Sequence, residues 1–417
     1  MTPTAVMLSS RFYVDTEKIK GKKILLRVDF NVSIKDKKVL SDFRIKRIIP
    51  TIKLLTEAGA KVILIAHIDD KEGGILEPVA RYLVAEFPKL FFVKDIFDPG
   101  VGETVSNMND GDVVLFENLR KWDGEKANDR EFAKHLASFA DVYMNDAFSV
   151  SHRSHASIVA VTEFLPSFFG PALKEEITQL SQVFNPHRPF LAVMGGAKFD
   201  TKVPLVSKFL DISDLVLVGG AIANDFIKAK GYFVGDSLVS EIEPEGIKEL
   251  LDHTKLLLPL DVYTLYKGER ILKHLGDIGV GEKILDVGDK TVKMLKIAVA
   301  ESDFVLWNGP LGKVESGFGG STEAFAKILA ESKVISIVGG GDCVSAIENL
   351  GIMDKFSFVS SGGGAMLDFL TEETLIGIEA LIASKKKQNF AFVLETKAEA
   401  IMEMPKGVFQ KIKEFLA

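Results

Sequence analysis

Short apolar runs of strand length alternate along this chain with longer segments whose apolar residues recur at helical spacing. Buried parallel strands read as nearly continuous apolar runs, because helices cover both faces of their sheet. The pattern therefore predicts an α/β fold with parallel sheets. We expect strands at 23–28, 61–66, 90–93, 112–116, 142–145, 189–194, 214–218, 255–258, 304–307, 334–338 and 356–359. We expect helices at 44–58, 76–87, 129–140, 173–184, 201–210, 290–300, 322–331 and 345–350.

The length of 417 residues favours two or three domains. Turn signals at Gly170-Pro171 and Asn185-Pro186 enclose the helical segment 173–184, which is the best candidate for a connection between domains. We therefore expect four parts, namely an N-terminal domain at 1–170, a connecting helix at 171–186, a C-terminal domain at 187–384 and an extension at 385–417. The extension could pack back on the N-terminal domain.

Charge and composition exclude several classes of protein. The formal net charge of -7 argues against general nucleic-acid binding, so any anion site must come from local groups. The single cysteine, Cys343, excludes an internal disulfide and fits a reducing cytosol. No apolar run approaches the roughly 18 residues that span a bilayer, and the N-terminus lacks the apolar core of a signal peptide. We expect a cytoplasmic monomer without nucleic-acid or membrane partners.

The two halves of the chain carry different groups for binding anions. In the first half, arginines and histidines follow the apolar runs, namely Arg44, His67, Arg120, His152, Arg153 and His155. In the second half, glycines take these places, at Gly195-Gly196, Gly219-Gly220, Gly339-Gly340-Gly341 and Gly362-Gly363-Gly364. Cationic side chains bind compact anions, and glycine turns let backbone N–H groups approach a polyphosphate. The asymmetry suggests phosphoryl transfer between a small metabolite and a nucleotide.

Each of these groups also has a plainer interpretation. Asp29 and Asn31 end a strand, where a ligand crevice is expected, but they could simply cap a turn. Arg44 taken alone could be a surface arginine. His152 and His155 could bind a metal, yet no cysteine or suitably spaced histidine supports this, so an anion cradle is the preferred interpretation.

The second half leaves similar alternatives. Lys198 and Lys202 would share one face if Lys198 opens a helix, although Lys202 could belong to a solvated basic helix. Asp342, after three glycines, could hold a magnesium ion on nucleotide phosphates or belong to a tight turn. The chain lacks the P-loop sequence, the catalytic sequences of protein kinases and a complete dinucleotide fingerprint.

Taken together, the chain resembles the phosphoglycerate kinase family from Arg27 to Leu381. The resemblance rests on eight segments in the family's order, namely RVDFN at 27–31, ENLR at 117–120, NDAF at 145–148, HRSH at 152–155, GGAK at 195–198, WNGP at 307–310, GGGD at 339–342 and GGGA at 362–365. It implies two Rossmann-like domains joined by a hinge helix. The expected activity is phosphoryl transfer between 1,3-bisphosphoglycerate with ADP and 3-phosphoglycerate with ATP, with Mg²⁺ on the nucleotide.

The resemblance also implies roles for particular residues. The phosphoglycerate would be held in the N-terminal domain by Asp29, Asn31, Arg44, His67, Arg120 and Arg153. The catalytic groups at the transferring phosphoryl would be Arg44 and Lys198. The nucleotide would contact Lys198, Lys202, Gly219, Gly220, Pro310, Leu311, Glu315, Gly341, Asp342 and Cys343 in the C-terminal domain, with Asp342 on the metal.

One departure from the family falls beside the expected substrate. Where the family usually has S-H-L-G-R-P, this chain has Ala66-His67-Ile68-Asp69-Asp70. Asp70 replaces a cation with an anion, although Lys71 could compensate. Two unit charges about 4 Å apart interact by about 1 kcal/mol in water and roughly 4 kcal/mol at an effective dielectric constant of about 20. Losing the attraction and adding repulsion could therefore lower substrate affinity by about an order of magnitude or more.

Two other functions stay open at this stage. The first is a paralogue that acts on another anionic acid, which Asp69 and Asp70 would favour. The second is a non-catalytic nucleotide-binding scaffold, against which the presence of Arg44 and Lys198 argues.

Overall fold

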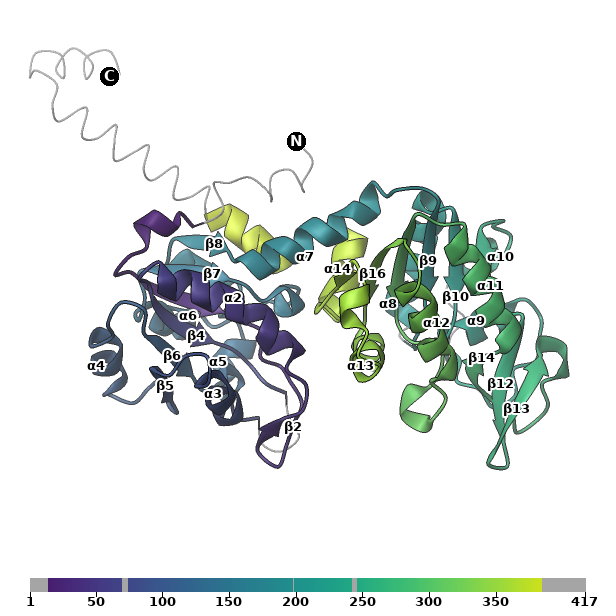
Figure 1. Cartoon of the computed structure of the whole chain (residues 1–417), viewed down its shortest axis with the longest axis horizontal. Helices are drawn as coiled ribbons and strands as arrows, with labels where there is room; N and C mark the ends of the chain where they lie inside the picture. Colours follow the sequence, from purple (N-terminus) through teal and green to yellow (C-terminus); the bar gives the residue numbers. More distant parts are fainter. Residues whose placement is uncertain (1–13, 70–73, 198, 242–245, 385–417) are drawn as a thin grey trace, which may run out of the picture. The chain divides into compact units, whose positions relative to one another are not determined.

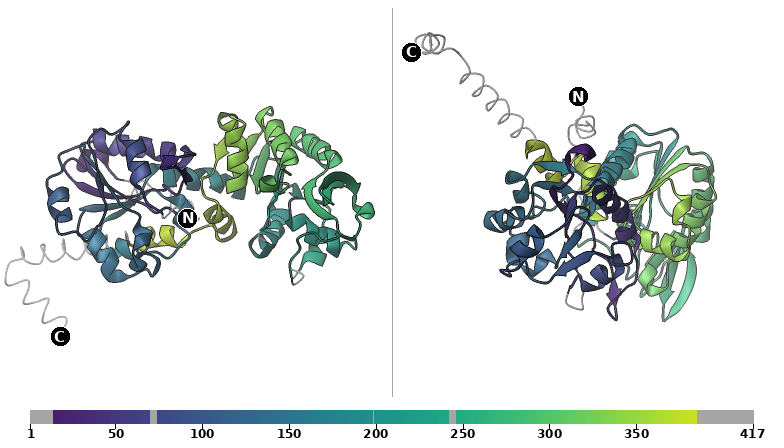
Figure 2. Two further views of the ribbon diagram at one scale, coloured as in Figure 1. Left: turned by 90° about the horizontal axis from the view of Figure 1, so that it is seen from below. Right: turned by 60° about the vertical axis from the view of Figure 1, so that its left-hand side comes forward.

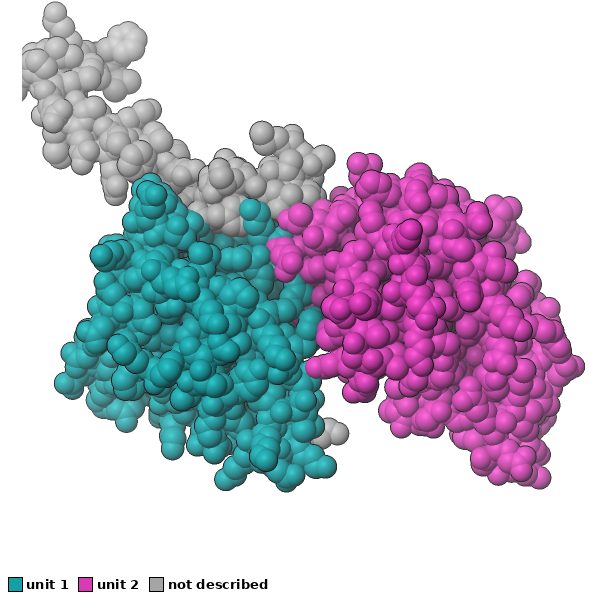
Figure 3. All heavy atoms as spheres, viewed as in Figure 1, with its two compact units in different colours: residues 1–174, 376–417 teal, residues 175–375 magenta. Residues whose placement is uncertain are grey.

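The computed structural model describes residues 14–69, 74–197, 199–241 and 246–384 (Figure 1). The chain divides into two compact units (Figure 3). Unit 1 comprises Met1–Lys174 and Ile376–Ala417, and unit 2 comprises Glu175–Leu375. Lys198, Asp70, Lys71 and the predicted extension lie outside the described residues.

Unit 1 contains a six-stranded parallel sheet in the order β5-β6-β4-β1-β7-β8. Its strands are β1 (Lys23–Arg27), β4 (Lys61–Ile65), β5 (Leu90–Val93), β6 (Val113–Phe116), β7 (Val142–Asn145) and β8 (Ser167–Phe169). The first five confirm the predicted strands. β8 was not predicted, because three residues are too few to stand out as an apolar run. A two-stranded hairpin, β2 (Ile34–Lys35) and β3 (Lys38–Val39), lies outside this sheet.

Helices lie on both sides of this sheet (Figure 2). They are α2 (Phe43–Glu57), α3 (Glu77–Leu83), α4 (Val101–Ser106), α5 (Asp123–Lys126) and α6 (Arg130–Ala137), with 3-10 turns η2 (Thr16–Lys18), η3 (Leu119–Lys121), η4 (Phe148–Val150) and η5 (Ala160–Glu163). α2 buries Ile45, Ile48, Ile52 and Leu55. This spacing of three and four residues places them on one face of the helix, within the apolar core that includes β1 and β4.

Unit 2 contains a second six-stranded parallel sheet, in the order β11-β10-β9-β15-β16-β17. Its strands are β9 (Phe190–Met194), β10 (Leu215–Val218), β11 (Leu256–Leu257), β15 (Phe304–Asn308), β16 (Ile335–Gly339) and β17 (Phe358–Val359). All six were predicted. The chain runs outward from β9 in one direction and from β15 in the other, which is the strand order of a Rossmann-type sheet. The prediction of two Rossmann-like α/β domains is confirmed.

The helices of unit 2 are α8 (Phe199–Ile212), α9 (Ile222–Ala229), α10 (Ile247–Leu251), α11 (Asp289–Ala300), α12 (Gly320–Ala330), α13 (Gly341–Asn349) and α14 (Gly364–Glu372), with 3-10 turns η7 (Leu275–Asp277), η8 (Val314–Ser316) and η9 (Met353–Lys355). A three-stranded antiparallel sheet, β13-β12-β14, was not predicted. It comprises β12 (Asp261–Tyr266), β13 (Glu269–His274) and β14 (Lys283–Val287). Lys267 and Gly268 both have positive φ, as a two-residue hairpin turn requires.

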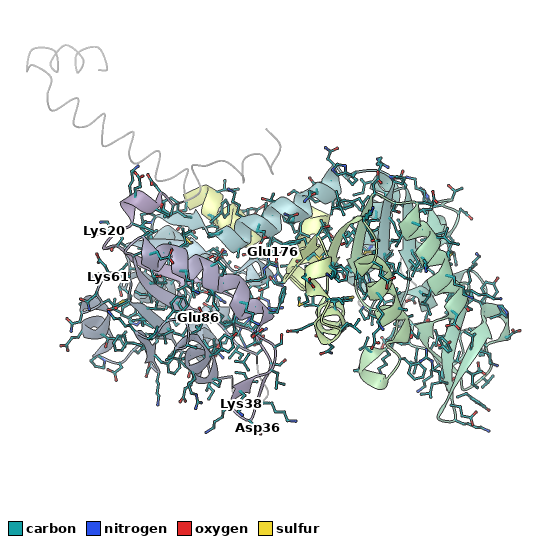
Figure 4. The ribbon with its side chains drawn as sticks, viewed as in Figure 1. Lys20, Asp36, Lys38, Lys61, Glu86 and Glu176 are labelled. Atoms are coloured by element: carbon teal, nitrogen blue, oxygen red, sulfur yellow. The ribbon has the colours of Figure 1, made fainter. Side chains whose placement is uncertain are left out.

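The division between the units falls within α7 (Pro171–Ser181), inside the predicted connecting helix, which η6 (Gln182–Phe184) follows. Glu176 of α7, labelled in Figure 4, accepts hydrogen bonds from Ser360 Oγ (2.7 Å) and Ser361 N (2.8 Å) of unit 2. Residues 376–384 group with unit 1, whereas the sequence analysis placed them in the C-terminal domain. One reason is that Gly377 N donates to Ser151 O of unit 1 (2.8 Å).

Among the residues that the structure describes, no helix combines the length and the apolarity needed to cross a bilayer.

A buried ionic network lies in the core of unit 1. The Arg27 side chain is fully buried and donates from Nε to Ser157 Oγ (2.8 Å) and from Nη1 to Val28 O (2.6 Å). The fully buried Glu125 carboxylate accepts from Ser157 N (2.9 Å) and Ser157 Oγ (2.6 Å), and its Oε1 lies 4.0 Å from Arg27 Nη2. Burial lowers the pKa of Arg27, and the charge of Glu125 opposes this shift. Glu125 therefore supplies the counter-charge that makes burial of Arg27 tolerable.

Unit 2 contains a buried carboxylate, Asp286, whose nearest positive charge comes from the partly exposed Arg270. Asp286 of β14 accepts hydrogen bonds from Ser321 N (3.2 Å) and Ser321 Oγ, and Arg270 Nη2 lies 3.8 Å away. Burial raises the pKa of Asp286 to about 6, although these hydrogen bonds and Arg270 favour the ionised form.

We predict that Glu125→Gln destabilises unit 1 by about 3–5 kcal/mol, because the shape is kept while the buried Arg27 loses its counter-charge. Each unit has one tryptophan, Trp122 in unit 1 and Trp307 in unit 2. In a Trp307→Phe background, denaturant unfolding followed by Trp122 fluorescence reports on unit 1. Glu86→Gln is the control, since the Glu86 carboxylate forms an exposed pair with Lys53 (2.6 Å) and should cost at most about 1 kcal/mol. Equal effects of the two substitutions would contradict the prediction.

The Asp286 pKa predicts a pH dependence of stability in unit 2. Because the folded state binds this proton more tightly than the unfolded state, the contribution of Asp286 is present below about pH 4 and is lost as the pH rises to about 6. The loss is on the order of 3 kcal/mol. Asp286→Asn removes this titration, so the unfolding free energy should fall less between these pH values than in the unsubstituted chain. Trp307 fluorescence in a Trp122→Phe background measures both curves, and parallel curves would rule the effect out.

Candidate functional site

Polar residues of unit 1 gather where its central parallel strands end. Asp29 and Asn31 follow β1, His67 follows β4, and Arg120 lies in η3, shortly after β6. The carboxyl ends of neighbouring parallel strands lie at one edge of the sheet, where open α/β sheets bind their ligands. The sequence prediction of a crevice at this edge therefore agrees with the topology.

Asp29 links several of the predicted groups. Its carboxylate pairs with Arg44 Nη1 of α2 and accepts hydrogen bonds from Ser149 Oγ (2.6 Å) and Asn31 N (3.0 Å). Asn31 in turn accepts a hydrogen bond from Asp69 N at Oδ1 (2.9 Å). The side chain of Asp29 is almost completely buried, so these contacts fix the position of Arg44 and of the loop after β1.

Arg120 forms the second cation–carboxylate pair. Its Nη1 contacts Asp69 Oδ2, while Nε and Nη2 are buried and have no hydrogen-bond partner among the described residues. Asn118, for which the sequence analysis gave no role, accepts from Arg120 N (3.1 Å) and Ile68 N (3.2 Å) and donates to Ile68 O (2.8 Å). Asn118 therefore holds the loop after β4 against η3. The segment ENLR at 117–120 contained this signal.

His67 is a neutral hydrogen-bonding group. Its pKa lies well below the ordinary value because the ring is buried, and because positive charges surround it from Arg27, Arg120, Arg153 and Arg44. Arg27 Nη2 lies 3.2 Å from His67 Nδ1, and a guanidinium can only donate. Nδ1 must therefore accept, and the ring proton lies on Nε2.

These groups form one electropositive region, which we call the basic cluster: Arg27, Arg44, His67, Arg120 and Arg153. Burial and the charge of Arg120 lower the pKa of Arg153, while Asp69 and Asp29 act in the opposite direction. Burial, followed by Arg120 and other positive groups, lowers the pKa of His155 to about 4, so this ring is neutral at pH 7. The structure thus brings together all six residues predicted for the phosphoglycerate. Mutual repulsion among the arginines favours a bound anion.

The described residues include no group of three or more histidine, cysteine, aspartate or glutamate side chains that could hold a metal ion. The metal alternative for His152 and His155 therefore gains no support. Arg153 Nε instead donates to His152 Nε2 (3.4 Å).

Unit 2 has a cavity of about 570 Å³ at the switch point of its sheet, where β9 and β15 lie side by side. This volume suits a nucleotide-sized ligand. Five predicted nucleotide-binding residues line it, namely Gly220, Pro310, Leu311, Glu315 and Asp342.

Glycines allow the loops at this switch point to approach one another. Gly196 N donates to Pro310 O (2.8 Å), and Gly195 N donates to Asn308 O (2.8 Å). Gly220 has a φ of +60°, and a Cβ there would lie 2.5 Å from Gly196 N. A side chain at Gly220 would therefore force these loops apart.

The other predicted nucleotide residues have different positions. Lys202 is buried, and its Nζ donates to Gly195 O and Asn308 O (3.4 Å), directly beneath the loops of the switch point. The Cys343 side chain is fully buried in α13, and burial raises the pKa of its thiol, so only its backbone is available for a ligand. Gly219 and Gly341 do not line the cavity.

Much of the cavity wall was missed by the sequence analysis. It includes Asn224, Leu238, Val262, Ile284 and Leu285. Three of these residues, Val262, Ile284 and Leu285, belong to the antiparallel sheet. Its strands are only partly buried, so the sequence shows no continuous apolar run there.

Asp342, one of the carboxylates that line the cavity, is compatible with a magnesium site. Asp342 is exposed in the first turn of α13 and lines the cavity. Mg²⁺ is usually bound by one or two carboxylates together with nucleotide phosphates and waters, so it needs no larger cluster of protein ligands.

Comparisons with known proteins agree with this arrangement. Residues 14–373 match the family model described as phosphoglycerate kinase. The chain is 39% identical over 382 residues to a phosphoglycerate kinase of Dictyoglomus turgidum, covering 88% of this chain and 96% of that protein. The solved phosphoglycerate kinase of Coxiella burnetii is 34% identical, with a TM-score of 0.74 over 88% of this chain and 97% of that one. The phosphoglycerate kinase of Pyrococcus horikoshii is 30% identical, with a TM-score of 0.80 over 90% of this chain and 100% of that one. The chain therefore belongs to the phosphoglycerate kinase family.

Proposed function

We propose that this chain transfers a phosphoryl group reversibly between 1,3-bisphosphoglycerate and ADP, giving 3-phosphoglycerate and ATP. One observation carries the proposal: the family match over residues 14–373 includes both the basic cluster of unit 1 and the cavity of unit 2. The proposed reaction needs an anion site and a nucleotide site in the same chain.

In this proposal unit 1 holds the phosphoglycerate. Arginine guanidinium groups bind phosphates and carboxylates through paired hydrogen bonds. Neutral His67 would add a donor at Nε2 without adding charge. Asp29 would orient Arg44, with which its carboxylate pairs. Asn31 would orient the loop after β4, because its side chain accepts a hydrogen bond from Asp69 N.

Unit 2 would hold the nucleotide. Gly220, Pro310, Leu311 and Glu315 line the cavity, and the family resemblance implies that Glu315 would contact the ribose of the nucleotide. Asp342 would hold Mg²⁺, which when bound neutralises phosphate charge. The loops and helices around the cavity would supply further contacts to the nucleotide, from Gly219, Gly341, Cys343 and Lys202. Lys198 is assigned to the nucleotide by the family resemblance alone.

The chemistry requires no general base. The carboxylate of 3-phosphoglycerate is already ionised at pH 7, so it can attack the terminal phosphoryl of ATP directly and in line. Catalysis then rests on positioning and on stabilising the charge of the transferring group, for which Arg44 and Lys198 are our candidates. Because the two predicted anion sites belong to separate units, direct transfer requires the ligands to be brought together by domain closure.

We further propose a monomer that acts in the cytoplasm without nucleic-acid or membrane partners. The net charge of -7 supports the absence of a nucleic-acid partner.

We predict ATP-dependent turnover of 3-phosphoglycerate, measured by coupling the 1,3-bisphosphoglycerate product to a reductase and following cofactor absorbance. Omission of Mg²⁺ should abolish the signal, because Asp342 alone cannot neutralise the nucleotide phosphates. Tight Mg-ATP binding without turnover of 3-phosphoglycerate would reject the proposal, and would favour a paralogue with another acid or a scaffold.

We also predict that Lys198→Ala lowers kcat by roughly 100- to 1000-fold while weakening nucleotide binding much less, since an interaction that strengthens in the transition state is lost. Steady-state kinetics and calorimetric titration with Mg-ADP measure the two effects separately. Lys293→Ala, at an exposed position on α11, is the control and should change neither. Equal losses in kcat and nucleotide affinity would contradict the transition-state role.

A further inference from the structure

Two carboxylates pair with arginines of the basic cluster, and Asp69 is held less firmly than Asp29. The Asp29 side chain is 6% exposed and is bound by Arg44, Ser149 and the backbone of Asn31. The Asp69 side chain is 47% exposed, and its carboxylate has a single described partner, Arg120 Nη1. A half-exposed carboxylate keeps part of its hydration and regains the rest when it leaves its partner, so its release costs less than that of the buried Asp29 carboxylate.

Arg120 is held in the opposite way. Its side chain is only 6% exposed, and Nε and Nη2 are buried with no hydrogen-bond partner in the part of the chain that the structure describes. The donor that faces a partner, Nη1, is engaged by Asp69. A buried guanidinium with unused donors favours a stronger acceptor than one mobile carboxylate. An incoming anion therefore meets Arg120 at a position that Asp69 already occupies.

Asp69 itself is fixed at its backbone. Asp69 N donates to Asn31 Oδ1 (2.9 Å), and the neighbouring Ile68 is held at both N and O by Asn118. The carboxylate can thus swing away from Arg120 without movement of the loop. The same tether keeps it near the cluster, so that it returns when the anion leaves.

We propose that Asp69 is a displaceable internal anion that occupies Arg120 in the free protein and yields it to an anionic group of the substrate. Asp69 thereby sets the affinity for phosphoglycerate. This inference rests on the proposed function, in which the basic cluster binds phosphoglycerate. It assigns to Asp69 a specificity-determining role in that reaction. The Asp69 carboxylate repels the anionic group of any acid that binds at Arg120, and the repulsion grows with the negative charge of that group.

The test is Asp69→Asn, which keeps an oxygen acceptor for Arg120 but removes the charge. We expect KM for 3-phosphoglycerate, and its dissociation constant measured calorimetrically without nucleotide, to fall about three- to tenfold. kcat and KM for ATP should stay unchanged, because the nucleotide cavity lies in unit 2. The difference between the two proteins should shrink as ionic strength rises, since salt screens half-exposed charges.

Two further variants complete the design. Glu163→Gln removes a carboxylate of matched exposure, 45%, that pairs with Arg130 away from the basic cluster, and should leave the affinity for 3-phosphoglycerate unchanged. Asp69→Gly removes both the charge and the acceptor of Arg120. Because no side chain then competes with the substrate for Arg120, KM for 3-phosphoglycerate should fall at least as far as it does in Asp69→Asn.

The outcomes separate this inference from the proposed function. An unchanged or raised KM in Asp69→Asn, with normal turnover, would overturn the inference and identify Asp69 as a residue that positions Arg120. If the unsubstituted chain neither binds nor turns over 3-phosphoglycerate, the proposed function itself is wrong.

Discussion

Both candidate sites depend on the parallel register of buried strands. Arg27 at the end of β1 lies opposite Ile65 of β4 and Asn145 of β7, and Asn308 at the end of β15 lies opposite Met194 of β9. Each sheet therefore ends its central strands at one level, and the loops that follow must share a small space. This constraint acts before any functional side chain is considered. It concentrates cationic residues in unit 1 and glycine turns in unit 2, because these are the residues that the sequence places directly after the strands.

Gathering several arginines at one sheet edge is unfavourable unless their charges are compensated. The structure compensates them from two sides. Beneath the edge, Glu125 offsets the fully buried Arg27. At the edge, Asp29 and Asp69 pair with Arg44 and Arg120. His67 and His155 add no charge at neutral pH, because burial and the neighbouring arginines hold their pKa values low. Among the described residues this compensation of charge is partial, since two donors of Arg120 have no hydrogen-bond partner there. Unit 1 thus stays poised for an anion at some expense to its own stability.

The sequence predicted the parts of the fold in which burial dictates the residue pattern. The parallel strands, such as β4 and β9, are continuous apolar runs because both faces of their sheets are covered. The antiparallel sheet escaped prediction because four of the six residues of β13 are charged or polar and the strand is largely exposed, so it gives no apolar run. The cavity residues that belong to this sheet were therefore not predicted either. In the candidate site the residue types were predictable, but their pairing was not. The prediction about the charge of Asp70 lies outside the described residues and stays a prediction, whereas the pairing of Asp69 with Arg120 was not anticipated. Such a pairing depends on the geometry of the loop after β4, which no residue propensity encodes.

In the proposed function the two units would bind phosphate-type groups by physically different means, and this difference decides how each site can be altered. In unit 1, affinity would come from side-chain charge, so one substitution at a half-exposed position such as Asp69 changes the electrostatic field without disturbing the core. In unit 2, affinity would come from backbone groups brought close together by glycines. A Cβ at Gly220 would lie 2.5 Å from Gly196 N, and one at Gly195 would lie 2.3 Å from Pro310 O. Any side chain there collides with backbone, which cannot yield as a flexible side chain can. The proposed metabolite site could therefore change affinity in small steps through single substitutions, whereas the proposed nucleotide site would be either retained with its glycines or lost.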